Sequence, residues 1–394
     1  MTGMTCHIDS LEDMCSLTCD NMVPKHKEER MKNTKCLFDE ERQTPAGMVS
    51  VSQLQTFMSC PKKWEYAYAE NLAPRVDRPY LTIGKLCHKG MQEAMRSAWM
   101  SQKRGDDQHW YSWRDAGIKA IEREWQEYVD SNTFLEEEMP DIEKTLGDAI
   151  SVFSQAYREF EPWKYKVLSV VNEGIEIPAL ELHFVIPCAG SKGLHGFIDA
   201  ILLDTETGFT WCTDYKFRKA LSPDEEEAEN IQNAVYTRAC MKMGIKITGT
   251  MTWQHVNTPA ATPTMLSNGK VSRAKIKTTW EKYANFCKNH GIDPEEYRDE
   301  MEPKLSDIEW FRPTYEYRNA ETVTAMWKEC VVPAAYAVKS AYKKKNRRNI
   351  YPWNCKMCQF KELCQAELRN HDADFIRQSS FVVREHGRNA KNTQ

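Results

Sequence analysis

Apolar and polar residues follow one another along Gly193–Lys219 in a pattern that predicts two β-strands joined by a turn. The strands are marked by Phe197, Ile198, Ile201, Leu202 and Leu203 before the turn, and by Phe209, Trp211, Thr213 and Tyr215 after it. Asp204-Thr-Glu-Thr-Gly208 supplies the turn residues. With a four-residue loop, 205–208, we expect Asp204 to pair with Phe209.

The same pairing places Asp199 directly opposite Asp214, and Lys216 shares the face of Asp214 because side chains alternate across a strand. Directly paired Cβ atoms lie about 5 Å apart. Two carboxylates that close repel each other unless a cation lies between them, and an adjacent ammonium group suits a reacting phosphate. A lone Asp-x-Lys is more often the solvated face of a hairpin, but the run before Asp214 is too apolar for an exposed edge. The pattern therefore favours a divalent-metal phosphodiesterase centre.

Upstream of this hairpin the pattern is mainly helical. Ser50 or Ser52 can cap a helix that Cys60-Pro61 interrupts, and residues 82–100 predict a second helix with His88 near its start. Helical periodicity continues over about 90–165, which we interpret as a helical insertion ahead of the sheet. Residues 167–187 then predict two strands.

Downstream of the hairpin, Ser222 and Pro223 predict a helix start, with the acidic run that follows as a solvated first turn. Gln232 and Tyr236, four residues apart, share one face of this helix. A strand at 245–259 and an insertion at about 259–301 follow. If Arg273, Lys275 and Lys277 lie on a strand, they form one basic face that could follow a DNA backbone, although a solvated face is equally consistent. The helix predicted at 321–345 ends in a basic cluster: Lys343, Lys344, Lys345, Arg347 and Arg348.

Composition sets bounds on these interpretations. The chain has 394 residues and a net charge of −4, so any contact with nucleic acid must come from local patches. It has no run of eighteen apolar residues, which excludes a spanning helix of the usual kind. Its first residues also lack the pattern of a secretory signal. Fourteen cysteines without such a signal indicate thiols or metal ligands in a reducing compartment. Residues 1–47 are polar and predict an extension without regular structure.

Three of the cysteines have the spacing of metal ligands. Cys355, Cys358 and Cys364 form C-x2-C-x5-C, and three thiolates cannot complete a tetrahedral or cubane site. Cys60, next to a proline at the other end of the folded region, is the candidate for the fourth ligand. Such a link closes a loop of nearly the whole domain, and the chain-entropy model gives an upper limit of about 5 to 6 kcal/mol for its stabilisation.

These motifs together resemble the PD-(D/E)XK nucleases, in particular their RecB-like branch. Gly196-x-x-Asp199, a hairpin and Asp214-x-Lys216 resemble motifs II and III, and Gly84-x3-His88 resembles motif I. Further matches complete the pattern, namely Gln232-x3-Tyr236 and the four cysteines, which resemble the [4Fe–4S] staple of AddB-type and CRISPR-associated RecB-like nucleases. The resemblance covers roughly residues 48–370.

The resemblance implies a restriction-endonuclease-like α/β fold: a mixed central sheet flanked by helices, with the helical insertion and a C-terminal iron–sulfur staple at 355–364, followed by a tail at 371–394. It implies that His88, Asp199 and Asp214 bind Mg²⁺ or Mn²⁺, together with Glu173 and the carbonyl of Tyr215. Glu176 competes with Glu173 but falls on the opposite strand face. Lys216 would orient water or neutralise charge, and Gln232 and Tyr236 would help to place the DNA strand. Zinc is the alternative to iron at the four cysteines.

The function implied is a metal-dependent DNA exonuclease or end-processing enzyme of DNA recombination, repair or phage DNA metabolism. The chain lacks a G-x4-G-K-[ST] loop, so it has no ATP motor of its own, and a separate helicase, recombinase or single-strand annealing protein is a plausible partner. The implied location is the cytoplasm of a bacterium or of a phage-infected cell. The alternative is a catalytically inactive DNA-binding or assembly subunit that retains the fold.

Overall fold

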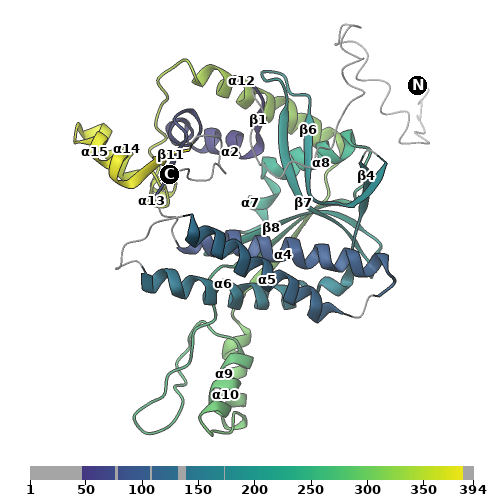
Figure 1. The fold of residues 1–394 in the computed structure, drawn as a ribbon, viewed down its shortest axis with the longest axis vertical. Helices are drawn as coiled ribbons and strands as arrows, with labels where there is room; N and C mark the ends of the chain where they lie inside the picture. Colours follow the sequence, from purple (N-terminus) through teal and green to yellow (C-terminus); the bar gives the residue numbers. More distant parts are fainter. Residues whose placement is uncertain (1–46, 76–78, 107–108, 132–138, 173, 385–394) are drawn as a thin grey trace, which may run out of the picture. The chain divides into compact units, whose positions relative to one another are not determined.

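The computed structural model describes residues 47–75, 79–106, 109–131, 139–172 and 174–384 (Figure 1). All of them belong to one compact unit, Cys36–Gln394. The predicted N-terminal extension, residues 1–47, lies outside the described residues except for Gly47, and so do residues 385–394 and Glu173. None of the helices in the described ranges is long and apolar enough to cross a membrane.

A mixed seven-stranded sheet forms the centre of this unit, and the predicted fold class is confirmed. Strand β7 is its longest member and pairs with four neighbours. The order β1-β7-β8-β9-β10 forms the main path, and β3 and β6 also pair with β7. The β1–β7 and β8–β9 pairs are parallel and the others antiparallel. The strands are β1 (Val49–Ser50), β3 (Tyr165–Val167), β6 (Leu180–Ile186), β7 (Leu194–Asp204), β8 (Thr210–Arg218), β9 (Gly249–Val256) and β10 (Phe311–Glu316).

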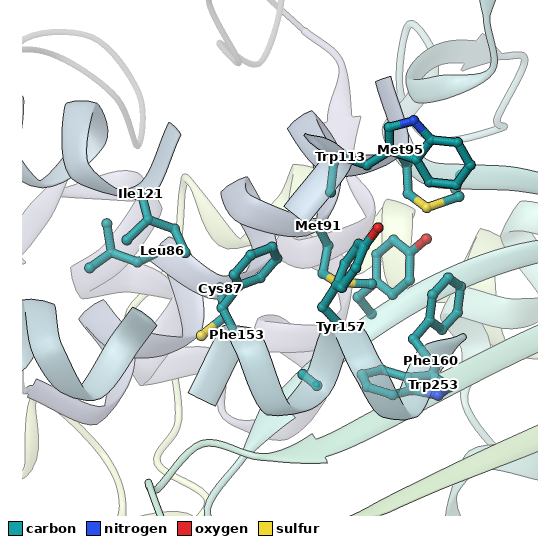
Figure 2. Close-up of a cluster of buried hydrophobic side chains, with 14 of the residues drawn as sticks. Leu86, Cys87, Met91, Met95, Trp113, Ile121, Phe153, Tyr157, Phe160 and Trp253 are labelled. Atoms are coloured by element: carbon teal, nitrogen blue, oxygen red, sulfur yellow. The ribbon is translucent and has the colours of Figure 1, made fainter. Parts of the chain in front are cut away.

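Helices cover both faces of the sheet (Figure 1). On one face, α4 (Pro79–Lys103), α5 (Trp110–Asp130) and α6 (Met139–Phe160) enclose the α4–α6 core, in which Met91, Met95, Trp113, Phe153, Tyr157 and Trp253 are buried (Figure 2). On the other face, α2 (Val51–Ser59), α8 (Ile231–Lys242) and α12 (Val332–Ala341) enclose the α2–α8 core, which includes Leu54, Ile198, Cys212, Val235 and Val338.

The pattern of inward-facing residues changes part-way along β6 and β7. The pair Leu180–Ala200 belongs to the α4–α6 core, whereas the next same-register pair, Leu182–Ile198, belongs to the α2–α8 core. Regular alternation would keep residues two apart on one face. Glu181, between the pairs, has φ +48°, a left-handed conformation that is rare for a residue with a side chain. Both strands therefore exchange faces at Glu181 and at Asp199, which lies opposite it.

The region 257–307 forms a small subsidiary unit. Helices α9 (Trp280–Asn289) and α10 (Glu295–Ser306) pack around their own core, which includes Val271, Tyr283, Tyr297 and Met301. The basic segment 270–277 is not a strand: the described part between β9 and α9 has an isolated bridge, Met265–Val271, and Arg273 pairs with Glu300 at 2.5 Å. The alternating basic face considered from the sequence therefore does not form.

The C-terminal segment packs beside the start of the folded region. It contains α13 (Pro352–Lys356), α14 (Lys361–Arg369), α15 (Ala373–Ser380) and β11 (Phe381–Val383). Strand β11 pairs antiparallel with β2 (Leu72–Pro74). The segment assigned to a tail beyond residue 370 is thus folded as far as β11. The other elements are α3 (Pro61–Trp64), η2 (Glu65–Ala69), η4 (Pro162–Lys164), β4 (Ser169–Asn172), β5 (Ile175–Pro178), α7 (Asp224–Ala228), α11 (Ala320–Met326) and η5 (Trp327–Val331).

Candidate active site

The β7–β8 hairpin has the register that its turn residues predict. Ala200 pairs with Thr213, and the Asp204 N–H donates to the Phe209 carbonyl at 2.8 Å. Oδ1 of Asp204 accepts two N–H groups of the loop, and Gly208 has φ +73°. Beyond Ala200–Thr213 the ladder ends, and the next pair in the same register would be Asp199–Asp214.

Asp199 is bound from two directions. His88, on α4, places Nε2 2.7 Å from Oδ2 of Asp199. The Tyr215 N–H of β8 donates to the same oxygen at 2.8 Å. Asp199 is 8 % exposed, so these contacts replace most of its water. A helix that is distant in the sequence and the neighbouring strand of the hairpin therefore fix this carboxylate.

Asp214 lies against the predicted lysine and glutamine. Nζ of Lys216 lies 2.9 Å from Oδ1 and 2.7 Å from Oδ2 of Asp214. Nε2 of Gln232 donates to Oδ1 at 3.1 Å and to the Tyr236 hydroxyl at 2.7 Å. Gln232 and Tyr236 are both buried. Gln232 therefore holds Asp214 in place, and Tyr236 holds Gln232.

Glu181 also belongs to this site, and sequence reasoning missed it. Oε1 of Glu181 lies 3.4 Å from Nδ1 of His88. One ligand atom from each of His88, Glu181 and Asp199 can be chosen so that all three lie within 4.8 Å of one another. The available signal was a single acidic residue inside the apolar run Leu180–Ile186. Glu176 is exposed and pairs with Lys103, as expected for a side chain that faces away from the site.

The carboxylates carry more negative charge than their protein partners balance. Burial raises the pKa of Asp214 to about 6, and the charge of Asp199 adds to this despite the opposing effect of Lys216. Burial also disfavours ionisation of Asp199, but His88, Lys216 and the Tyr215 N–H outweigh it and lower its pKa. Oxygen and imidazole ligands around a site that resists a second negative charge suit a divalent cation such as Mg²⁺ or Mn²⁺.

Because of this raised pKa, we expect Asp214→Asn to stabilise the metal-free protein at neutral pH. The folded-state pKa, about 6, exceeds the ordinary value of 3.8, so the folded chain binds this proton more tightly and ionisation disfavours folding. The upper limit is about 3 kcal/mol at pH 7, and about half of it remains at pH 5. Thermal melts in chelator should show a gain that shrinks as the pH falls. Asp148→Asn, at an exposed ion pair with Lys144, is the control. A gain that grows toward low pH would contradict the assigned pKa shift.

The polar residues behind Lys216 form a second layer. Arg218 pairs with Glu227 and donates to Gln254 at 3.0 Å. Glu227 is 2 % exposed, so the acidic run predicted as a solvated turn is partly a buried ion pair. Pro223, not Ser222, is the N-cap of the short helix α7, and Asn230 caps the separate helix α8. These contacts fix the chain between β8 and α8.

Residues 48–365 match the sequence profile of the PD-(D/E)XK nuclease superfamily. The chain belongs to this superfamily. The match begins just before β1, ends within α14 and includes the sequence Asp214-Tyr-Lys216. The mixed sheet flanked by helices is consistent with the restriction-endonuclease-like fold of the superfamily. Its members are nucleases, which cleave phosphodiester bonds of DNA with divalent metal ions. The comparison with curated proteins gave no match.

Three cysteines of the predicted staple, Cys355, Cys358 and Cys364, lie on or between α13 and α14, which with α15 and β11 form a C-terminal lobe. Cys60 follows α2, and its preceding residue Ser59 accepts hydrogen bonds from Asn349 at 2.8 Å and from Asn354 at 3.3 Å. Burial raises the pKa of the Cys358 thiol, and nearby Cys60 and Cys364 raise it further. The N-terminal cysteine thus comes close to members of the C-terminal group.

Ionic contacts join the same two chain ends independently of any metal. Glu367, on α14, accepts a hydrogen bond from the Tyr66 hydroxyl at 2.7 Å and lies 3.2 Å from Nζ of Lys62. Arg348 binds Glu367 at 2.8 Å, and its Nε lies 3.3 Å from Sγ of Cys364. Arg348, a member of the basic cluster noted in the sequence, therefore has partners inside the lobe.

Proposed function

We propose that the chain is a metal-dependent DNA nuclease of the RecB-like branch, an exonuclease or end-processing enzyme. The juxtaposition of Asp199, Asp214 and Lys216 at the open end of the β7–β8 ladder, with His88 beside Asp199, is the observation that carries this proposal. These residues come in the order in which the sequence resembles the RecB-like motifs.

In this proposal His88, Asp199, Asp214 and Glu181 hold Mg²⁺ or Mn²⁺. Glu181 then supplies the additional carboxylate that the sequence assigned to Glu173. A bound divalent ion would activate water and stabilise negative charge on the phosphate. The protein brings the carboxylates together before the ion arrives, at the cost of the burial and the repulsion from Asp199 that raise the pKa of Asp214.

Lys216 has a separate role because it is a cation that cannot ligate the metal while protonated. Its side chain is one-quarter exposed, so it can meet a substrate phosphate while Nζ contacts Asp214 and Gln232. We assign to it the orientation of the attacking water or the neutralisation of charge on the phosphate. Gln232 then positions Asp214 and Lys216, and Tyr236 supports Gln232. Through these contacts the two residues would help to place the DNA strand at the site.

We further propose that Cys60, Cys355, Cys358 and Cys364 hold a [4Fe–4S] cluster, with zinc as the alternative. The electrostatic effect of Cys60 and Cys364 on the Cys358 thiol supports a shared metal, as do the hydrogen bonds from Asn349 and Asn354 to Ser59, the residue before Cys60. The cluster would be structural, because it joins the two ends of the folded region. Partners consistent with a nuclease that lacks a motor are a helicase, a recombinase or a single-strand annealing protein, in a bacterial or phage-infected cell.

Digestion of matched DNA substrates tests the proposal. Linear and circular DNA, single- and double-stranded, are incubated with Mg²⁺ or Mn²⁺ and with chelator. We expect metal-dependent loss of linear DNA with release of short products, and survival of covalently closed circles. Cleavage of circles would indicate an endonuclease. Metal-dependent binding of DNA without cleavage of any substrate would instead favour the inactive DNA-binding subunit.

A further inference from the structure

The side-chain amide of Gln232 is bound on both sides. Its Oε1 accepts a hydrogen bond from Nζ of Lys216 at 3.2 Å, and its Nε2 donates to Asp214 and Tyr236. An ammonium group can only donate and an ionised carboxylate can only accept, so these charged partners determine which way the amide points. The Gln232 amide thereby links the position of Lys216 to that of Asp214.

A residue of the N-terminal helix α2 completes this arrangement. Nε2 of Gln55 donates to Oε1 of Gln232 at 3.4 Å and to Oδ1 of Asn230 at 3.1 Å. Asn230 is the N-cap of α8, and the same Oδ1 accepts the Gln232 N–H at 3.0 Å. Gln55 thus contacts both the amide that binds Lys216 and the end of the helix that carries this amide.

Helix α2 is itself held firmly, so it can serve as a fixed support. Ser50 caps its start by accepting the Gln53 N–H at 3.1 Å, and Val49 pairs with Leu194 of β7. At its other end, the carbonyl of Ser59 accepts hydrogen bonds from Nδ2 of Asn349 at 2.8 Å and from Nδ2 of Asn354, in α13, at 3.3 Å. The position of the Gln55 backbone is therefore set by the sheet on one side and the C-terminal segment on the other.

We propose that Gln55 is a positioning residue of the active site, which holds the Gln232 amide and the start of α8 so that the Lys216 ammonium is directed at the substrate phosphate. The inference rests on the proposed function, in which Lys216 acts on the phosphate. Lys216 has a flexible four-carbon chain, and within the part of the chain that the structure describes its ammonium donates to Asp214 and Gln232. When a cation binds the oxygens of Asp214, the Lys216 ammonium can still donate to Oε1 of Gln232. Gln55 keeps that oxygen in place.

Steady-state kinetics of Gln55→Ala and Gln55→Met test this role on the full-length chain. We expect kcat to fall about tenfold, as for loss of one hydrogen bond that supports a charged group, while KM for DNA stays within about twofold. Gln55→Met keeps most of the side-chain volume, so an equal loss in both variants assigns the effect to the amide. Melting temperatures should remain close to that of the unsubstituted chain. The control is Gln126→Ala, which removes an exposed amide that bonds Asp130 on α5 and should leave kcat unchanged.

A double-mutant cycle with Gln232→Ala separates positioning from a general effect on structure. If Gln55 acts through Gln232, then Gln55→Ala has no further effect on kcat in the Gln232→Ala background. Full additivity, an effect on KM alone, or unchanged kcat in Gln55→Ala would overturn the proposal. An inactive Lys216→Ala beside a fully active Gln55→Ala refutes the role of Gln55 and leaves the nuclease assignment intact. Full turnover by Lys216→Ala refutes both.

Discussion

Asp199→Asn and Lys216→Ala should each lower metal-dependent DNA cleavage by about a thousandfold or more while the protein remains folded. Asp199 contacts His88 and the Tyr215 N–H and lies opposite Glu181, so its charge is central to any cation in this site. Lys216 places its ammonium beside Asp214, and its side chain retains solvent exposure. Cleavage is followed as release of labelled nucleotides from linear DNA, with melting temperature and circular dichroism as checks of folding.

The two variants should differ in how they bind metal. Asp199→Asn removes a ligand charge, and Glu181→Gln does the same from β6, so calorimetric titration with Mn²⁺ should show weakened binding in both. Lys216→Ala removes a competing cation and should bind Mn²⁺ at least as tightly as the unsubstituted chain. This split distinguishes loss of metal from loss of the group that acts on the phosphate.

Matched controls come from a second Asp–Lys pair. Lys144 lies 3.0 Å from Asp148 on α6, an exposed pair of the same chemistry on a helix surface. Asp148→Asn and Lys144→Ala should leave cleavage unchanged. Retained turnover in Asp199→Asn or Lys216→Ala would show that cleavage occurs elsewhere or by another set of residues.

Cys60→Ser should remove the proposed cluster and much of the stability of the domain. Protein purified without oxygen should be brown, with visible charge-transfer absorption and about four iron atoms per chain. The substitution breaks a covalent link between the two ends of the folded region, whose entropic contribution has an upper limit of about 5 to 6 kcal/mol. We expect a smaller loss, because the Glu367 contacts and the β2–β11 pairing also join these ends. Iron content, visible spectra and denaturant unfolding measure the effect.

The control for this substitution is Cys330→Ala. Cys330 is a partly buried thiol in η5 that packs against the α2–α8 core and is not one of the four proposed ligands. Its replacement should leave the iron content unchanged. A colourless protein that contains zinc would establish the zinc alternative, and full iron content in Cys60→Ser would mean that another residue completes the cluster.

Short-range patterns were sufficient for the hairpin. The loop Asp204–Gly208 fixes its own geometry through the Asp204 side chain and a glycine with positive φ, and the loop length fixes the register. The opposition of Asp199 and Asp214 and the common face of Asp214 and Lys216 followed from that register alone. The Gln232–Tyr236 contact was accessible in the same way, because residues four apart on a helix are neighbours.

Other expectations from sequence patterns were wrong where long-range contacts prevailed. The acidic run after Pro223 contains a residue that burial and Arg218 draw into the interior, so Glu227 is not part of a solvated turn. The basic segment before α9 remains without a strand partner beyond a single bridge, so alternation does not apply to it. Periodicity describes a residue's neighbours within its own element and carries no information about which other element will pack against it.

The sequence by itself determined the mixed α/β class, and the hairpin with its register. It also determined which residue types are available to bind a metal ion and a phosphate. The tertiary structure alone decided that Glu181 faces His88, because a left-handed residue reverses the inward face of β6 and no pattern of apolar residues encodes that reversal. It also decided that Gln55 reaches Gln232. These residues lie 177 positions apart, and their contact exists because the sheet, α2 and α8 pack as one body.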